Sequence, residues 1–399
     1  MSTYNILLTC ILIIFVFLLL SMLSFKNVID NYFKRVNKNY IITPLIVISV
    51  ILIIVSFLTP YFYTDTDIGN SIEFDAETGQ TGDTIGGIMN PFIALAGAVL
   101  TFIAFYIQKI ANDDIKNQFK IQQFESQFYE MLRLHKENIN EMRINGYEPS
   151  IEASIQKDNS NNIISKTETI TTVTRVTEGR KVFVTMITEL VTCYEILEYY
   201  DNQWQTNIAK QHLLELAYRF FFFGSKSEIV SSKYIDKLII ENFRIELNKI
   251  RDLHKNSSGV KNIISGLEGK EIKLYIKYLP FSGHENRLGH YYRHLYSTVK
   301  YIVNKEKEGL YNYKQSREYL KILRSQMSND EQLMLYYNYI IGFGADWENE
   351  GYLTKYRMLH NLPINKVKYA EDPRTHFSVF INSIKEGEGE LFEWGDFEQ

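Results

Sequence analysis

Cysteine is scarce in this chain of 399 residues, and its scarcity excludes two ways of stabilising a fold. Cys10 lies in an apolar run, Cys193 lies far from it, and the two do not form a CxxC motif. A disulfide framework and a thiolate zinc site are therefore excluded, and the bulk of the chain suits a reducing cytosol.

Motifs of common enzyme chemistry are also lacking. The chain has no GxxxxGKS/T phosphate loop, no GxGxxG after a strand, no HExxH and no GxSxG. No segment repeats with a period of roughly 20–50 residues, which excludes a solenoid. We therefore predict neither a cofactor nor a metal ion, and whether the protein is an enzyme stays open.

Charge is absent from three long stretches, which are Ser2–Phe25, Asn39–Thr64 and Thr84–Gln108. Each exceeds the roughly 20 apolar residues that a membrane-spanning helix needs. We predict a membrane domain over residues 1–108 with three transmembrane helices, at about 4–25, 41–60 and 86–107. The opening segment MSTYN carries no positive charge, which favours an uncleaved anchor over a cleaved signal peptide.

The loops between these stretches differ in charge, and the difference predicts their orientation. The 26–38 loop has four Lys and Arg residues against one acid, whereas the 65–83 loop has six acids and no Lys or Arg. Because positively charged loops stay in the cytoplasm, the first loop is predicted inside and the second outside. The chain after residue 108 then forms a large cytoplasmic domain.

That cytoplasmic part is predicted to be mainly α-helical. Residues 109–142 have apolar side chains at helical spacing, which fits a stalk or coiled coil, or an amphipathic helix lying on its own domain. Imperfect heptads favour the amphipathic helix. Residues 143–178 combine turn signals such as Gly146 with the β-branched run IISKTETITTVTRVT, so we predict a small β-hairpin insert. Residues 179–365 are predicted to be a helical domain, and 366–399 an acidic C-terminal tail.

Within the helical domain, the pattern predicts helices at about 180–201, 205–223, 228–254, 265–278, 285–304, 312–325, 328–342 and 350–360. Ser328 followed by Glu331 has the spacing of a capping box that opens the 328–342 helix. Gly224 after YRFFFF is typical of a helix carboxyl end.

The segment FSGHENRLGHYYRHLYSTVKYI at 281–302 concentrates polar residues beside a predicted core face. On a helix over 285–304, one stripe is apolar and consists of Leu288, Tyr292, Leu295, Val299 and Ile302. The adjoining stripe is polar, which places its residues in a half-buried position. We take as candidate binding or structural residues His284, Arg287, His290, Tyr291 and His294, together with Arg324 and Glu331 farther along the chain.

Three interpretations of this polar stripe are open. His290 and His294 have the i,i+4 spacing of zinc ligands, but a third ligand is missing nearby, so no metal site is predicted. Arg287 and His294 resemble the loose Arg–x(4–6)–His pattern of HEPN ribonucleases, where the arginine would hold a phosphate and the histidine would move protons. Leu288 departs from that pattern, which usually has a polar residue after the arginine. We favour the third interpretation, in which the stripe bonds to neighbouring helices or binds a signal, because buried polar groups are usually satisfied locally.

Charge balance gives no support for a general nucleic-acid surface. Residues 109–399 hold 39 Lys and Arg against 40 Asp and Glu, although residues 284–324 hold nine against four. Nucleic-acid binding therefore stays an open alternative that depends on the polar stripe.

Five blocks of the sequence together resemble the family of putative phage abortive infection proteins (AbiC-like). They are TGDTIGGIMNPFIALAGAVLTFIAFYIQ at 81–108, FKIQQFESQFYEMLRLHKENINEM at 119–142, GHENRLGHYYRHLYSTVKYI at 283–302, YLKILRSQMSNDEQLMLYYN at 319–338 and LTKYRMLHNLP at 353–363. The resemblance covers most of residues 81–363 and is weak in the 143–178 insert and after Glu371.

The resemblance implies a toxin-like effector of bacterial antiviral defence, anchored in the inner membrane by several spans. Such proteins stop growth or kill the infected cell before phage is released. The expected partners are the lipid bilayer, an unknown phage-derived or host trigger, and further copies of the same chain. The resemblance carries over no catalytic residue.

Overall fold

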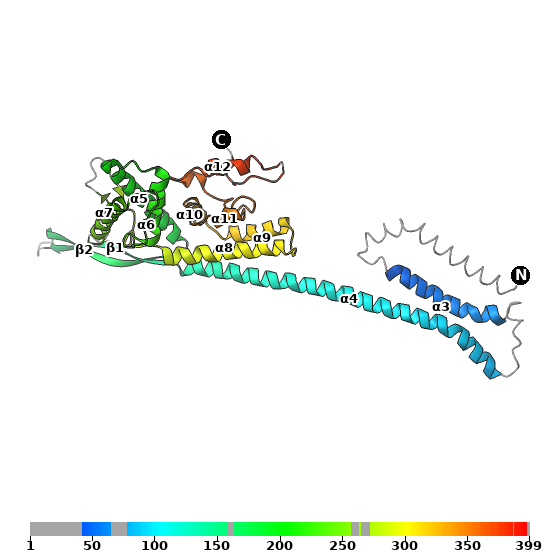
Figure 1. Ribbon diagram of the computed structural model, residues 1–399. Helices are drawn as coiled ribbons and strands as arrows, with labels where there is room; N and C mark the ends of the chain where they lie inside the picture. The colour runs from blue at the N-terminus through cyan, green and yellow to red at the C-terminus, as the bar shows by residue number, and fades with distance from the viewer. Residues whose placement is uncertain are drawn as a thin grey trace. The chain divides into compact units, whose positions relative to one another are not determined.

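The computed structural model describes residues 42–64, 78–157, 163–256, 263–264, 272–385 and 387–396. It divides into two compact units, Met1–Ile121 and Gln122–Gln399, and its described residues are mainly helical, with a β-hairpin between α4 and α5 (Figure 1). The mainly α fold class and the hairpin insert are thereby confirmed. The first predicted span, at about 4–25, lies outside the described residues.

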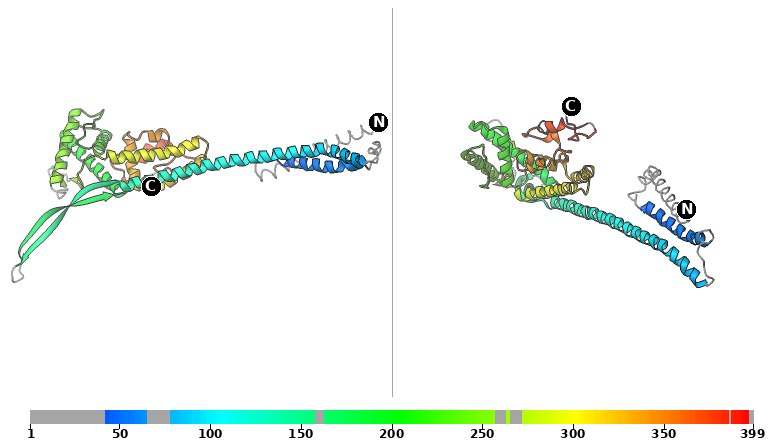
Figure 2. Two further views of the ribbon diagram at one scale, coloured as in Figure 1. Left: turned by 90° about the horizontal axis from the view of Figure 1, so that it is seen from below. Right: turned by 45° about the vertical axis from the view of Figure 1, so that its right-hand side comes forward.

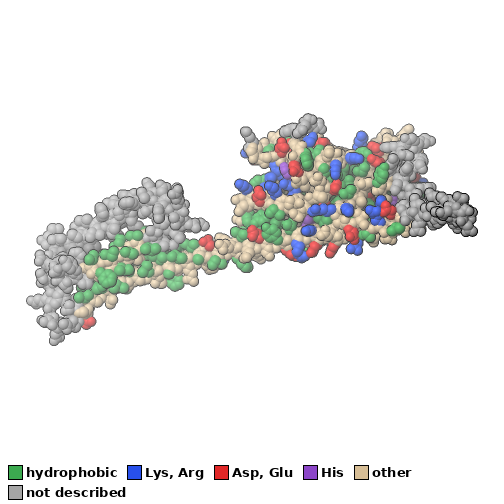
Figure 3. Space-filling model, turned by 180° about the vertical axis from the view of Figure 1, so that it is seen from behind, with side chains coloured by type: hydrophobic (Ala, Val, Ile, Leu, Met, Phe, Trp, Pro, Cys, Tyr) green, Lys and Arg blue, Asp and Glu red, His purple; other side chains and the backbone are tan. Residues whose placement is uncertain are grey.

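Helix α3 (Ile42–Thr64) and the amino-terminal part of helix α4 (Thr78–Glu141) belong to the first unit. They expose large apolar side chains, including Phe57, Phe102 and Phe105. Small residues lie where the two helices meet. Ala96 is buried, and Ser56 Oγ of α3 donates to the Met89 carbonyl of α4 at 3.4 Å. Figure 3 shows hydrophobic side chains covering this surface.

Among the described residues, one helix is long and apolar enough to cross a membrane, and it is the part of α4 from Ile85 onward. A shorter apolar helix covers Pro44–Thr59. Helix α4 runs without interruption through the predicted third span and the predicted 109–142 helix. Pro91 lies inside this helix, which begins at Thr78.

The second unit packs helices around one hydrophobic core. Its longer helices after α4 are α5 (Lys181–Trp204), α6 (Lys210–Phe223), α7 (Lys237–Asn256), α8 (Glu285–Lys307), α9 (Tyr313–Ser325) and α10 (Asn329–Ile340). Its short helices are α11 (Asp346–Asn349), η2 (Ile364–Lys366), α12 (Pro373–His376) and α13 (Ser378–Ile381). Two short strands, β3 (Ile263–Ile264) and β4 (Ile272–Lys273), pair antiparallel.

The carboxyl end of α4 packs alongside α8 (Figures 1 and 2). Residues 111–123 of α4 are exposed, whereas Phe124 and Phe128 are fully buried. Phe124 stacks on Tyr301 of α8 at 5.3 Å between ring centroids, and both phenylalanines meet Tyr319 of α9 edge-on. These aromatic contacts hold the last turns of α4 on the helical core.

The hairpin follows α4 directly, with strand β1 (Arg143–Lys157) antiparallel to β2 (Ile163–Glu178). Figure 2 shows it extending away from the helices of its unit. At its base, the Tyr147 N–H donates to the Lys277 carbonyl at 2.8 Å. A Cβ at Gly146 would come within 2.0 Å of that carbonyl oxygen, so Gly146 permits this approach within a strand and does not form the predicted turn.

Four predicted segments differ from the structure. The predicted 228–254 helix begins only at Lys237, since residues 228–236 are turns and loop. The predicted 265–278 helix is wrong over its described part, because Ile272 pairs with Ile264 in a strand and Pro280 follows shortly after. The predicted 350–360 helix is a run of turns, since Gly351 and Arg357 have left-handed φ angles of 68° and 57°. The predicted acidic tail contributes Phe377, Ile381, Leu391 and Phe392 to the core.

Candidate functional site

Helix α8 orients the polar stripe, and its predicted phase is confirmed on the apolar side. Leu288, Leu295, Val299 and Ile302 are completely buried and Tyr292 nearly so. Each has the i, i+3 or i+4 spacing that keeps it on one face of a helix. On the polar side, Tyr291 is completely buried, Arg287 and His294 are half-buried, and His290 is exposed, which contradicts its predicted half-buried position.

His284 directly precedes α8 and belongs to a buried cluster centred on Glu189 of α5. Glu189 is fully buried and accepts from three donors, namely Nε2 of His284 at 2.7 Å, the Phe281 N–H at 2.5 Å and the Tyr278 hydroxyl. Burial first, and then the Glu189 charge, raises the pKa of Tyr278 well above its usual value. This cluster ties the loop before α8 to α5.

The same loop approaches the end of α6 closely. The His284 N–H donates to the Phe222 carbonyl at 2.8 Å, and Gly283 has a left-handed φ of 87°. A Cβ on Gly283 would lie 2.8 Å from the Phe223 backbone, so only glycine fits between the two segments. Gly224 forms the predicted carboxyl cap of α6, with its N–H donating to the Phe220 carbonyl.

Tyr291 and Glu331 form a second buried cluster between α8 and α10. Glu331 is fully buried and accepts from the Tyr291 hydroxyl at 3.0 Å. It also accepts from the Ser328 N–H and hydroxyl, which confirms the predicted capping box, and Arg180 Nε lies 3.4 Å away. Burial raises the pKa of Glu331, while the bonds from Ser328 and Tyr291 oppose that rise. The carboxyl group thus joins α8, α10 and the residue preceding α5.

His135 of α4 lies against this second cluster. Its ring centroid is 5.5 Å from that of Tyr291 and 5.9 Å from that of His294. Burial, helped by the charges of His294 and Arg180, lowers the pKa of His135 to about 4, and burial also lowers the pKa of His294. Both imidazoles are therefore neutral at neutral pH.

Arg287 and His290 line a surface groove of 540 Å³ where the end of α4 meets β1. Arg287 Nε donates to the Arg143 carbonyl at 2.9 Å. His294 is not among the residues lining this groove; it follows Arg287 by seven positions, or about 10 Å along the helix axis. The two residues of the ribonuclease pattern thus contact different groups.

Arg324 lies apart from the stripe, at the end of α9. It is buried and donates from Nε to Asn361 Oδ1 at 2.9 Å and from Nη1 to the Arg357 carbonyl at 2.8 Å. Burial, with repulsion from Arg317 and Arg357, lowers its pKa to about 10. Through these contacts Arg324 holds the turns after α11.

The structure adds three residues to this site that the sequence analysis missed, namely Glu189, His135 and Arg180. Of these three, only Glu189 could have been identified from the sequence, because it is the one acid in the apolar run VTMITELVTCY. Within the described part of the chain, no group of three or more His, Cys, Asp or Glu residues is arranged to hold a metal ion. The hydrogen bonds to Glu189 and Glu331 are those of buried polar groups satisfied by neighbouring helices.

Comparison with known proteins supports the resemblance seen in the sequence. The model of the family described as putative phage abortive infection protein matches residues 283–367. This stretch runs from the loop before α8 to η2 and contains all seven candidate residues predicted from the sequence. No curated protein and no solved structure matches the chain.

Proposed function

We propose that this chain is a membrane-anchored protein of bacterial abortive infection. In this proposal its second unit senses or binds an infection signal, and its apolar helices act on the bilayer of the inner membrane. The large second unit then lies in the cytoplasm, and further copies of the chain are candidate partners. The family match at residues 283–367 supports the role in phage defence.

The observation that carries the membrane part is the composition of α4. This single helix joins a charge-free, largely exposed apolar stretch, Thr84–Gln108, to the polar residues that follow. Exposed side chains such as Leu100 and Phe102 are unfavourable in water, and lipid would remove them from it. An uncharged helix of this length also matches the thickness of a bilayer.

A pair of double variants tests this proposal in bacteria challenged with phage. Leu100→Lys with Phe102→Lys places two charges in the predicted span, each costing about 3 kcal/mol at a membrane centre. We expect this variant to insert its third span poorly and to lose protection. The matched control, Ile229→Lys with Leu238→Lys, changes two exposed side chains of the second unit and should keep both properties.

The competing proposal is a membrane-tethered ribonuclease that uses Arg287 and His294. Membrane potential and RNA integrity, followed together after infection, distinguish the two. Depolarisation with intact RNA supports action on the bilayer. RNA breakdown that precedes any change in potential, and that persists when the span carries the two lysines, contradicts it and supports the ribonuclease.

A further inference from the structure

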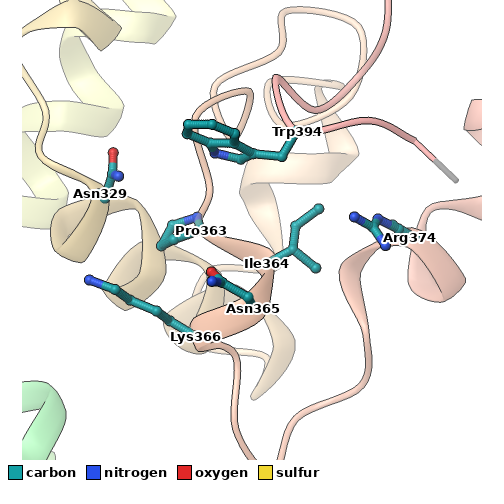
Figure 4. Close-up of a pocket in the computed structure, with 7 residues that line it drawn as sticks. All are labelled: Asn329, Pro363, Ile364, Asn365, Lys366, Arg374 and Trp394. Atoms are coloured by element: carbon teal, nitrogen blue, oxygen red, sulfur yellow. The ribbon is translucent and has the colours of Figure 1, made fainter. Parts of the chain in front are cut away.

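The carboxyl end of the second unit holds a pocket of 440 Å³ that none of the contacts above explains. Four separate segments line it, which are the start of α10, the turn at 363–366, α12 and the turn at 391–396 (Figure 4). Its volume lies within the range of small-molecule sites. Its lining combines an exposed indole, two cations and two amides, and no carboxylate is among the lining residues.

We propose that this pocket binds a phosphorylated nucleotide, with Trp394 stacking on the base and Arg374 contacting the phosphate. The inference deepens the proposed function, because it names the chemical class of the signal that the second unit would bind. The nucleotide is either a free mononucleotide or the 5′-phosphorylated end of an RNA, since both present the same base and phosphate.

Trp394 has the properties of a preformed stacking surface. Its side chain is 57% exposed, although the turn that carries it is tied down on both sides. The N–H groups of Leu391 and Phe392 each donate to the Asp396 carboxylate at 2.8 Å, and the Glu393 N–H donates to the His360 carbonyl at 2.8 Å. A rigid turn that presents an indole to solvent loses little freedom when a base stacks on it.

Arg374 is positioned for phosphate by the same turn. Its Nε donates to the Gly395 carbonyl at 3.2 Å, and its backbone N–H donates to the helix-capping Asp372 carboxylate at 2.7 Å. Its two terminal nitrogens have no partner among the described residues, so the bidentate edge of the guanidinium is available. Gly395 has a left-handed φ of 94°, which favours glycine at this contact.

The remaining lining suits the rest of a nucleotide. Figure 4 shows Trp394 above Pro363 and Ile364, with Asn329 on one side of them and Arg374 on the other. Asn329 and Asn365 carry amides that both donate and accept, which is what the polar edge of a base requires. Lys366 adds positive charge, although its Nζ also lies 3.5 Å from Asp330. Inorganic phosphate alone would leave the indole exposed, so the base is part of the ligand.

Tryptophan fluorescence of the purified full-length chain in detergent gives a direct test. Trp347 is buried and Trp204 is half-buried, so Trp394 is the exposed indole among the three. We expect each of the four 5′-mononucleotides, or a subset, to quench this signal. Adenosine and inorganic phosphate, as probes of the two halves, should bind at least about tenfold more weakly than the best nucleotide.

Variants separate the two contacts, with binding measured by calorimetry. Trp394→Ala should weaken nucleotide binding by about 5- to 100-fold, whereas Trp394→Phe should abolish the quench and keep most of the affinity. Arg374→Ala should remove the preference for a nucleotide over its nucleoside. Val379→Ala and Arg293→Ala, at exposed positions outside the pocket, serve as matched controls, and unchanged melting temperatures show that the variants are folded.

A 5′-phosphorylated tetranucleotide RNA, titrated in parallel, distinguishes the two sources of the ligand. Tighter binding of the RNA assigns the site to an RNA end, and tighter binding of a mononucleotide assigns it to a free nucleotide. Failure of both to bind, or equal binding by the wild type, Trp394→Ala and Arg374→Ala, overturns the inference. Because this assay needs no infection, its result is independent of the phage challenge that tests the proposed function.

Discussion

His135 of α4 faces His294 of α8 with their ring centroids 5.9 Å apart. Both ring nitrogens of His135 and Nδ1 of His294 are buried and have no hydrogen-bond partner in the described part of the chain. Two neutral imidazoles lie where the end of α4 packs on the core, and a proton on His135 would be buried close to the Arg180 charge. The contact between α4 and α8 is accordingly sensitive to acid.

The first prediction concerns that sensitivity. The pKa of His135 is lowered from about 6.5 to about 4, so the unfolded chain binds the proton more tightly than the folded one. The stabilisation that neutral His135 gives the folded state is therefore complete above about pH 6.5, and it is lost as the pH falls toward 4. We expect His135 to account for a loss of roughly 1 kcal/mol of unfolding free energy between pH 7.5 and 5.5.

His135→Phe isolates this effect, because a ring of similar size fills the space and cannot be protonated. The difference in unfolding free energy between wild type and variant, measured from pH 5 to 8 by urea titration, should change with pH in the predicted direction. Taking this difference also removes the opposite effect of Glu331, whose raised pKa favours the folded state at lower pH. If the unfolding free energies of wild type and variant instead change with pH in parallel, the folded state does not lower the pKa of His135.

The second prediction concerns the buried Glu189. Glu189→Leu leaves the Tyr278 hydroxyl, the Phe281 N–H and His284 Nε2 without their acceptor. At about 1–3 kcal/mol for each unsatisfied buried group, the unfolding free energy should fall by about 3 kcal/mol or more. Glu195→Leu on the same helix is the control, because Glu195 is half-buried and bonds to an exposed tyrosine. Equal losses in thermal unfolding would contradict the central role of Glu189.

The third prediction concerns the bond between α8 and α10. Tyr291→Phe keeps the ring and removes the donor to Glu331 Oε2, so it should cost about 1.5–3 kcal/mol, as for hydrogen bonds to charged groups. Tyr369→Phe removes a comparable hydroxyl-to-carboxylate bond at the surface and should cost less than about 1 kcal/mol. If the two variants unfold at the same urea concentration, the buried bond contributes no more than an exposed one.

The fourth prediction separates a structural role from ribonuclease chemistry. His294→Gln keeps hydrogen-bonding capacity but cannot transfer a proton near neutral pH, whereas His294→Ala removes the side chain. We expect Gln to retain most phage protection and Ala to lose more, together with a lower melting temperature. Loss of protection in both at unchanged melting temperature, with RNA breakdown in the wild type alone, would support the nuclease.

A fifth prediction compares two arginines of α8. Arg287 makes one bond to the Arg143 carbonyl from a half-buried position, so Arg287→Ala should cost about 1 kcal/mol. Arg293 is exposed and bonds only within its own helix, to the Gly289 carbonyl, so Arg293→Ala should cost less than about 0.5 kcal/mol. A larger loss for Arg293 in thermal unfolding would contradict the orientation of α8.

Local patterns were enough to predict much of this protein. The apolar face of α8, the capping box of Ser328 and Glu331, the glycine cap at Gly224 and the β-hairpin all follow from residue spacing over one or two turns. The same holds for the charge-free stretch within α4. In each case the residues that determine the structure are neighbours in the chain, so their order alone carries the information.

Contacts between segments that are distant in the sequence became known only from the tertiary structure. Glu189 contacts His284 across 95 residues, Glu331 bonds to Tyr291, and His290 is exposed. The 391–396 turn, expected as part of an acidic tail, brings Trp394 beside Arg374. Such contacts depend on how whole helices pack, because many side chains on one face must be buried together before any single donor finds its acceptor. Periodicity therefore predicts which face is buried, and packing alone determines what each buried polar group meets.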